Sequence, residues 1–164
     1  MQDFFLKDVE DGTLAVVGYK GDEPDVVIPV PKGKNITILG DNLFSGHKEI
    51  RSIEIPDTVT DMGEFLFDGC EELKSLKLPK ELTTLWGYTF ARCGLEEIIL
   101  PDKLRAIPPF AFKDCRNLKR VVPGKELRKI YAWAFGGCDQ LQELLCGGEV
   151  EISPQAFLSK ELNR

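Results

Sequence analysis

The sequence contains few of the residues from which catalytic sites and metal centres are usually built. His47 is the single histidine among 164 residues, so a serine- or cysteine-type triad would lack its usual base. The five cysteines form no CxxC pair, which disfavours a zinc centre or a thioredoxin-like site. No glycine-rich phosphate loop is present, and carboxylate pairs such as Glu71 and Glu72 fall on polar turns. The sequence therefore predicts a protein that is not an enzyme and holds no cofactor or metal.

Long apolar runs and an excess of positive charge are also missing. No apolar stretch approaches the roughly 18 residues that a membrane-spanning helix needs. The net charge of −6 disfavours nucleic acid or an anionic membrane as the partner of the whole surface. Charged residues from Asp3 to Asp11 exclude a signal peptide at the start of this chain. We therefore expect that the protein is not exported, or that its export signal lies outside this chain.

The dominant feature of the sequence is a repeated motif, in which phenylalanine is followed three positions later by cysteine. Phe67, Phe90, Phe112 and Phe135 each begin one copy, while Phe44 and Phe157 stand in the same place with His47 and Lys160 in the fourth position. Successive phenylalanines are separated by 23, 23, 22, 23 and 22 residues. A period of this length predicts a stacked repeat array, which normally serves as a binding surface.

Each repeat divides into recognisable parts. Residues 73–79 show the L-x-x-L-x-L spacing of a leucine-rich repeat strand, ending at a proline turn. One residue per strand is expected to point outward, namely Glu54, Lys77, Ile99, Val122 and Leu145. A second short apolar pair follows, and then the segment with the phenylalanine. There Leu66, Phe67 and Cys70 are spaced for one face of a single helical turn. We expect strand, turn, short strand and short helix in every repeat.

The ends of the chain depart from the repeat. Residues 1–35 contain three strand-like runs and are interpreted as an N-terminal β-hairpin cap on a solenoid domain that covers residues 36–164. The last strand would leave an open edge, so we expect either a homodimer through that end or a piece of a longer array. The cysteines, one per repeat at the same place, are expected to be buried free thiols.

The pattern Leu-x-x-Leu-x-Leu-Pro, then Leu-x-x-Leu, then Phe-x-x-Cys resembles the BspA-like leucine-rich repeat family over residues 36–157. The stretch 11–14 followed by 26–29 also resembles the family's capping segment. The resemblance implies an α/β, right-handed solenoid of about five repeats, with no enzymatic activity and no catalytic residues to transfer. It also implies adhesion, host-protein binding or co-aggregation at a bacterial cell surface. His47, the shifted Pro123 and the missing export signal depart from the family pattern, and a cytoplasmic location stays open.

One candidate binding face is aromatic. In four repeats an aromatic residue stands two positions before the repeated phenylalanine. Two of these repeats carry another aromatic residue two positions earlier still. These residues are Phe65, Trp86, Tyr88, Phe110, Tyr131 and Trp133. Stacked repeats would align them into a column that could anchor a partner. The alternative is that the rings fill the outside of the stack by packing on one another.

A second candidate face is charged. Seven acidic residues and no lysine or arginine lie between positions 54 and 72, whereas seven basic residues lie between 113 and 129. The candidate basic patch comprises Lys113, Arg116, Lys119, Arg120, Arg128 and Lys129. It could meet an acidic partner, including a second copy of the chain, or it could be an ordinary solvated surface.

Overall, the sequence predicts a protein-binding scaffold whose partner, host or self, it does not name. The alternative is a structural or oligomerisation module of a larger protein.

Overall fold

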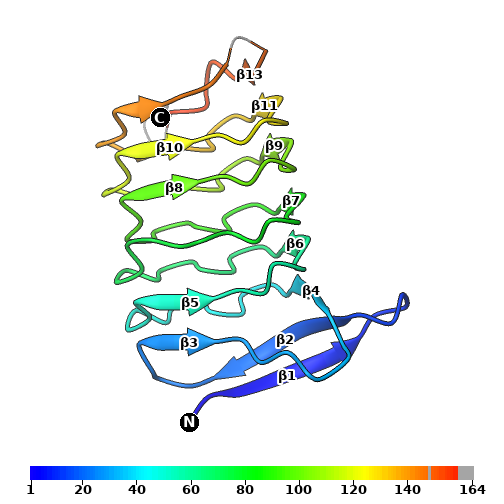
Figure 1. Ribbon diagram of the computed structural model, residues 1–164. Coiled ribbons are helices and arrows are strands. Elements are labelled where there is room, and N and C mark those ends of the chain that lie inside the picture. Colours follow the sequence, from blue (N-terminus) through cyan, green and yellow to red (C-terminus); the bar gives the residue numbers. More distant parts are fainter. Residues whose placement is uncertain (148, 159–164) are drawn as a thin grey trace.

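The computed structural model describes residues 1–147 and 149–158, and its chain winds into a stack of coils (Figure 1). Within these residues the chain forms thirteen strands: β1 (Asp3–Asp8), β2 (Leu14–Lys20), β3 (Asp25–Val27), β4 (Ile36–Leu39), β5 (Ser52–Glu54), β6 (Asp61–Met62), β7 (Thr84–Leu85), β8 (Glu97–Ile99), β9 (Ala106–Ile107), β10 (Arg120–Val122), β11 (Lys129–Ile130), β12 (Glu143–Leu144) and β13 (Glu151–Ile152). The repeat predicted from the sequence is thus a solenoid.

Every coil contributes to three sides of the stack. The first side, called the strand face below, consists of β3, β5, the segment 75–77, β8, β10 and β12 (Figure 1). The second side carries β4, β6, β7, β9, β11 and β13, and the third, called the turn side, carries the repeated phenylalanine. Strands of neighbouring coils pair in parallel, for example Val121 of β10 with Ile98 of β8. Equivalent side chains therefore stand in register from coil to coil.

The expected N-terminal hairpin is formed by β1 and β2, which pair antiparallel around a turn at Gly12. β2 then pairs in parallel with β4, so the hairpin extends the second side of the stack. Tyr19 of β2 lies between two rings: its centroid is 5.0 Å from that of Phe4 and 5.1 Å from that of Phe44. The hairpin thereby covers the first phenylalanine of the array.

The expected short helices are wrong, because the described residues contain no helix. Leu66, Phe67 and Cys70 are fully buried, as predicted, but they lie in a chain of turns. The N–H groups of Phe67 and Gly69 donate to carbonyl oxygens of the next coil, at 2.8 and 2.9 Å, rather than to oxygens four residues back. The α/β description is therefore corrected to a β-solenoid.

Backbone conformation explains why no helix forms on the turn side. In each of the five coils from Phe44 to Phe135, two positions have positive φ: one lies two residues before the repeated phenylalanine, and the other two residues after it. The first set is Asn42, Phe65, Tyr88, Phe110 and Trp133; the second is Gly46, Gly69, Arg92, Asp114 and Gly137. A left-handed residue reverses the backbone twist and interrupts a right-handed helix. Each phenylalanine is thus held between two tight bends.

The core is a ladder of parallel rings beside a ladder of thiols. Phe44, Phe67, Phe90, Phe112 and Phe135 are buried, and neighbouring rings stack with centroids 5.0 to 5.6 Å apart. All five cysteines are free. Four of them donate the S–H to the backbone carbonyl of the phenylalanine in the preceding coil, at 2.9 to 3.2 Å. His47 replaces the first cysteine, and its ring contacts Tyr19 and Glu49.

The strand face is interrupted in one place. The segment 75–77, in the repeat whose sequence shows the strand pattern most clearly, forms no strand. β5 pairs with β3 and β8 pairs with β10, and neither pairs with this segment. The second side also breaks between β7 and β9, where Pro108 has no N–H to offer the preceding coil. Both breaks lie beside the repeat that is one residue shorter than its neighbours. The shortening is at Gly94, and this glycine lies against the carbonyl oxygen of Glu71.

Candidate interaction surfaces

The predicted aromatic column is present, and its rings contact one another. Phe65, Tyr88, Phe110 and Trp133 form a continuous stack with centroid distances of 4.5, 4.8 and 5.3 Å and interplanar angles of 7 to 15°. All four side chains are half-buried. Left-handed backbone at each position turns the ring into line with its neighbours. The geometry accounts for these aromatics by lateral packing, and their use in recognition stays a prediction.

Trp86 and Tyr131 lie outside this stack. Trp86 is 52% exposed and Tyr131 is 40% exposed. Lys129 Nζ lies 4.7 Å from the centroid of the Tyr131 ring, within cation–π distance. The two rings are on coils separated by an intervening coil that carries Pro108 in the equivalent place. The structure therefore does not join them into one continuous aromatic surface.

The predicted basic residues are dispersed over the coil rather than gathered in a patch. Arg120 is on β10 of the strand face, whereas Lys129 is on β11 of the second side. Arg120 contacts Glu97 at 2.6 Å and Glu143 at 3.0 Å, and Lys129 contacts Glu151 at 3.6 Å. Arg116 contacts Asp139 at 3.3 Å. Arg128 donates to the backbone carbonyl oxygens of two neighbouring residues.

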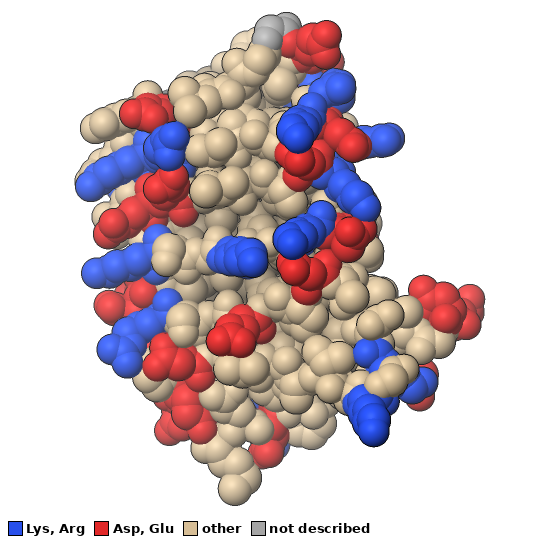
Figure 2. Space-filling model, in the orientation of Figure 1, with Lys and Arg blue, Asp and Glu red and all other residues tan. Residues whose placement is uncertain are grey.

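These ion pairs link neighbouring coils, because partners stand 21 to 24 residues apart. Further examples are Lys48 with Glu71, Arg92 with Asp68, Lys103 with Glu81, Arg105 with Glu126 and Lys125 with Asp102. Figure 2 shows the result: lysine and arginine alternate with aspartate and glutamate along two borders of this view. A run of one charge along the chain is thus interleaved in space with the opposite charge. Binding through the basic residues stays a prediction.

The strand face carries the outward column expected from the alternation of its strands. Ile99 is 62% exposed and Leu145 is 54% exposed, while Glu54 and Lys77 are exposed and Val122 is half-buried. In Figure 2 a strip largely free of charge runs between the two charged borders, over the side that carries β8 and β10. The alternation along the strands predicts that these residues point outward, but it does not mark them as a binding site. The feature of the sequence that could have identified a site is the change in these outward residues, which are charged up to Lys77 and apolar after it.

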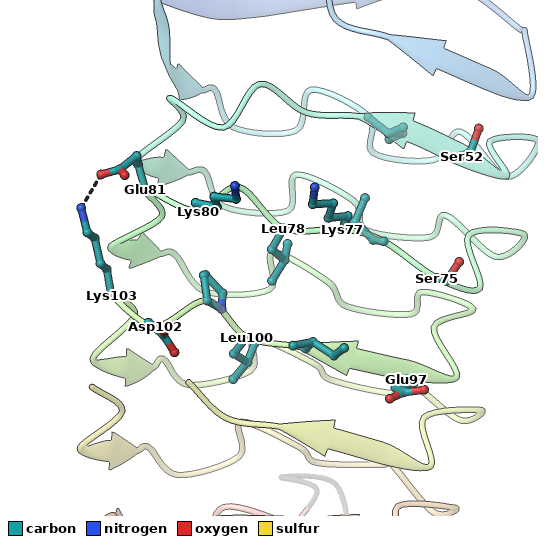
Figure 3. A pocket seen from close by; sticks show the side chains of 14 residues that line it. Ser52, Ser75, Lys77, Leu78, Lys80, Glu81, Glu97, Leu100, Asp102 and Lys103 are labelled. Atoms are coloured by element: carbon teal, nitrogen blue, oxygen red, sulfur yellow. Dashed lines mark hydrogen bonds and ion pairs between the residues drawn. The ribbon is translucent and has the colours of Figure 1, made fainter. Parts of the chain in front are cut away.

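A groove of about 950 Å³ opens on this face where the sheet is interrupted (Figure 3). Its lining combines outward and inward side chains of three coils: Ser52, Ile53, Ser75, Leu76, Lys77, Leu78, Lys80, Glu81, Glu97, Ile99, Leu100, Pro101, Asp102 and Lys103. Leu76 is half-buried, whereas its equivalents Ile98 and Val121 are buried. The missing strand pairing therefore leaves part of the core accessible from the strand face.

The described residues contain metal-ligating side chains and free cysteine thiols. No group of three or more histidine, cysteine, aspartate or glutamate side chains within them could hold a metal ion. Burial raises the pKa of the Cys70 thiol to about 12 and raises the pKa of Cys93 and Cys115 well above the ordinary value. Such thiols remain protonated and are poor nucleophiles near neutral pH. Over the same residues, no helix is long and apolar enough to cross a membrane.

Comparison with known proteins identifies the repeat. The family model of the BspA type leucine rich repeat region matches residues 37–163 with six copies. The chain belongs to the BspA-type leucine-rich repeat family. The family model thus recognises six copies where the sequence predicts about five.

Solved structures of leucine-rich repeat proteins share the fold of this BspA-type chain. A leucine rich repeat protein from T. pallidum has a TM-score of 0.74 at 22% identity, covering 98% of this chain and 90% of that one. A leucine-rich repeat protein from Bacteroides ovatus has a TM-score of 0.67 at 24% identity, covering 94% and 49%. A leucine rich cell surface protein from Faecalibacterium prausnitzii has a TM-score of 0.62 at 20% identity, covering 84% and 51%. No curated protein matches the chain.

Proposed function

We propose that the protein is a non-enzymatic scaffold that binds other proteins through its strand face. The observation that carries this proposal is the outward column, in which Ile99 and Leu145 are more than half exposed. Aligned apolar side chains that remain in solvent are typical of interaction surfaces. The stacked core holds these side chains in register, so that contacts from several coils can add together. Membership in a repeat family whose members generally serve in protein interactions supports the same conclusion.

The proposed setting is a bacterial cell surface, where the scaffold would take part in adhesion or in binding a host protein. This setting is supported by the similarity of the fold to that of the leucine rich cell surface protein from Faecalibacterium prausnitzii. The aromatic column and the basic residues are secondary candidates within the proposal, because the rings stack on one another and Arg116, Arg120 and Lys129 already have acidic partners.

A selection experiment tests the proposal. A phage-displayed peptide library is selected on the immobilised full-length protein, and the recovered clones are measured on three proteins: wild type, Ile99→Lys and Trp86→Ala. Both side chains are exposed, so both variants are expected to fold; Ile99 lies on the strand face and Trp86 lies outside it. We expect most clones to lose binding to Ile99→Lys and to keep it on Trp86→Ala. Recovery of no specific clone, or loss on Trp86→Ala alone, would contradict the proposal.

The second candidate is a structural or oligomerising module. It is favoured by the exposed apolar residues of the last described coil, Ile152, Phe157 and Leu158, which are 38%, 48% and 39% exposed. Light scattering at low and high salt tests it. A monomer in both conditions contradicts self-association, whereas a dimer that dissociates in high salt indicates pairing through charged faces, and a dimer that persists indicates apolar contacts.

A further inference from the structure

The groove at the interruption of the strand face contains free backbone groups. Ser75, Leu76 and Lys77 follow one another on an exposed stretch, and their N–H and C=O groups form no hydrogen bond with any described residue. One backbone bond crosses just before them, from Glu96 N–H to the carbonyl oxygen of Lys74 at 2.9 Å. Backbone donors and acceptors that neither neighbouring coil satisfies remain available to water or to a ligand.

The charges that line the groove leave a positive surplus. Each of its three acidic side chains has a cationic partner: Glu81 with Lys103, Glu97 with Arg120 and Asp102 with Lys125. Lys77, by contrast, forms no ion pair within the described part of the chain, and Lys80 reaches Asp57 at the limiting distance of 4.0 Å. In Figure 3 the side chains of Lys77 and Lys80 extend to the same side of the segment 75–77. The unpaired charge therefore favours a carboxylate.

The remaining lining is apolar. Leu76 is half-buried and Ile99 is 62% exposed, and both line the groove beside Leu78 and Leu100. A volume of about 950 Å³ is within the range of natural ligand pockets, which is roughly 300 to 1,000 Å³. A peptide side chain of the size of valine or leucine can enter it and remove these apolar surfaces from water.

We propose that this groove binds a short, extended segment of a partner protein in which acidic and apolar side chains alternate. The main chain of the segment would bond to Ser75, Leu76 and Lys77, its carboxylate would lie between Lys77 and Lys80, and its apolar side chain would contact Leu76 and Ile99. The inference rests on the proposed function, because it specifies the chemistry of the partner that the strand face binds.

Fluorescence anisotropy with the full-length protein tests this inference. The probe is a fluorescein-labelled heptapeptide of alternating valine and glutamate, and a second heptapeptide carries lysine in place of glutamate. Lys77→Glu removes the unpaired cation, while Lys74→Glu makes the same charge change on the same coil, outside the groove lining. We expect saturable binding of the acidic peptide, weakened about tenfold by Lys77→Glu and changed less than about twofold by Lys74→Glu. The lysine peptide is expected to bind about tenfold more weakly than the acidic one.

Amide chemical shifts separate the outcomes. Binding should shift the amide signals of Ser75, Leu76 and Lys77, because their N–H groups become donors. Equal weakening by Lys77→Glu and Lys74→Glu, absence of saturable binding, or shifts confined to the aromatic stack would overturn the inference. The proposed function would survive those results if the peptide selection still yields clones that depend on Ile99; failure of that selection would remove both.

Discussion

The Sγ atom of Cys93 donates a hydrogen bond of 2.9 Å to the backbone carbonyl oxygen of Phe67, one coil earlier. The thiol is buried, and the same bond recurs in three other coils. Each bond is the second one at a carbonyl oxygen that also accepts the backbone N–H of the residue three positions later, and it ties the cysteine to the phenylalanine of the preceding coil. Cysteine is therefore used here as a small apolar residue with one donor, rather than as a reactive group.

Replacing Cys93 by alanine should lower the free energy of unfolding by about 1–3 kcal/mol, because a buried sulfur and a buried hydrogen bond are both lost. Urea unfolding followed by circular dichroism measures the change. Cys146→Ala is the matched control, because Cys146 is half-buried and its thiol forms no hydrogen bond with a described residue. It should change stability by less than about 0.5 kcal/mol. Equal effects of the two variants would argue against a structural thiol ladder.

Stability should fall at alkaline pH. Burial raises the thiol pKa of Cys70 to about 12 in the folded protein, while the pKa of an unfolded thiol is about 8.5. The unfolded state therefore loses its proton first, and stability falls as pH rises from the unfolded value to the folded one. The slope approaches about 1.4 kcal/mol per pH unit for each such thiol. Urea unfolding between pH 8 and 11 should show a shallower decline for Cys93→Ala than for wild type; parallel curves would exclude this origin.

Phe110 has a left-handed backbone conformation. At this position we expect a glycine variant to be more stable than an alanine variant, the reverse of the usual order. Phe110 has a φ of 63° and stacks between Tyr88 and Trp133. Both substitutions remove the stacking, but alanine keeps the steric strain of a positive φ and glycine does not. Phe110→Gly should therefore be more stable than Phe110→Ala by about 1 kcal/mol. At exposed Thr83, whose φ is not positive, alanine should be the more stable. Thermal unfolding of the four variants measures the difference at each site. If glycine and alanine rank in the same order of stability at both sites, the conformational argument is refuted.

The ion pairs between coils should make stability depend on salt. Arg120→Glu places a third carboxylate between Glu97 and Glu143, so the melting temperature should drop at low ionic strength and recover partly in high salt. Lys119→Glu makes the same charge change at an exposed neighbour that forms no ion pair in the described structure. It should leave the melting temperature nearly unchanged. If both variants melt alike at every salt concentration, the pairs have no role in stability.

The repeat, its phase and the direction of most side chains follow directly from the sequence. Phenylalanines at nearly constant spacing required a stack, and alternation at Ile53 and Glu54 placed one side chain inward and the other outward, as the structure shows. The helical turn at Leu66, Phe67 and Cys70 was wrong because short-range spacing cannot distinguish a helix from a turn whose N–H groups bond to the next coil. The positive φ of the aromatic residues could not be predicted from the sequence, because bulky residues rarely adopt that backbone conformation.

The candidate surfaces were harder to predict because they depend on contacts between coils. The basic run from Lys113 to Lys129 reads as a patch along the chain, but residues about 23 positions away bring acidic partners to it. The groove arises from a missing strand at 75–77, in a repeat whose own pattern is regular. The neighbouring repeat is shortened at Gly94, close to Glu71, and such a relationship between coils is not visible in the pattern of one repeat.

Hydrogen–deuterium exchange of the full-length protein, with and without a selected peptide, tests the central claim most directly. If the strand face is the binding surface, the peptide should slow exchange in the segments around 52–54, 75–77 and 97–103. Exchange around Trp86, Tyr131 and Trp133 should not change. Protection of these aromatic segments, with the strand face unaffected, would contradict the account and transfer the binding function to the aromatic column.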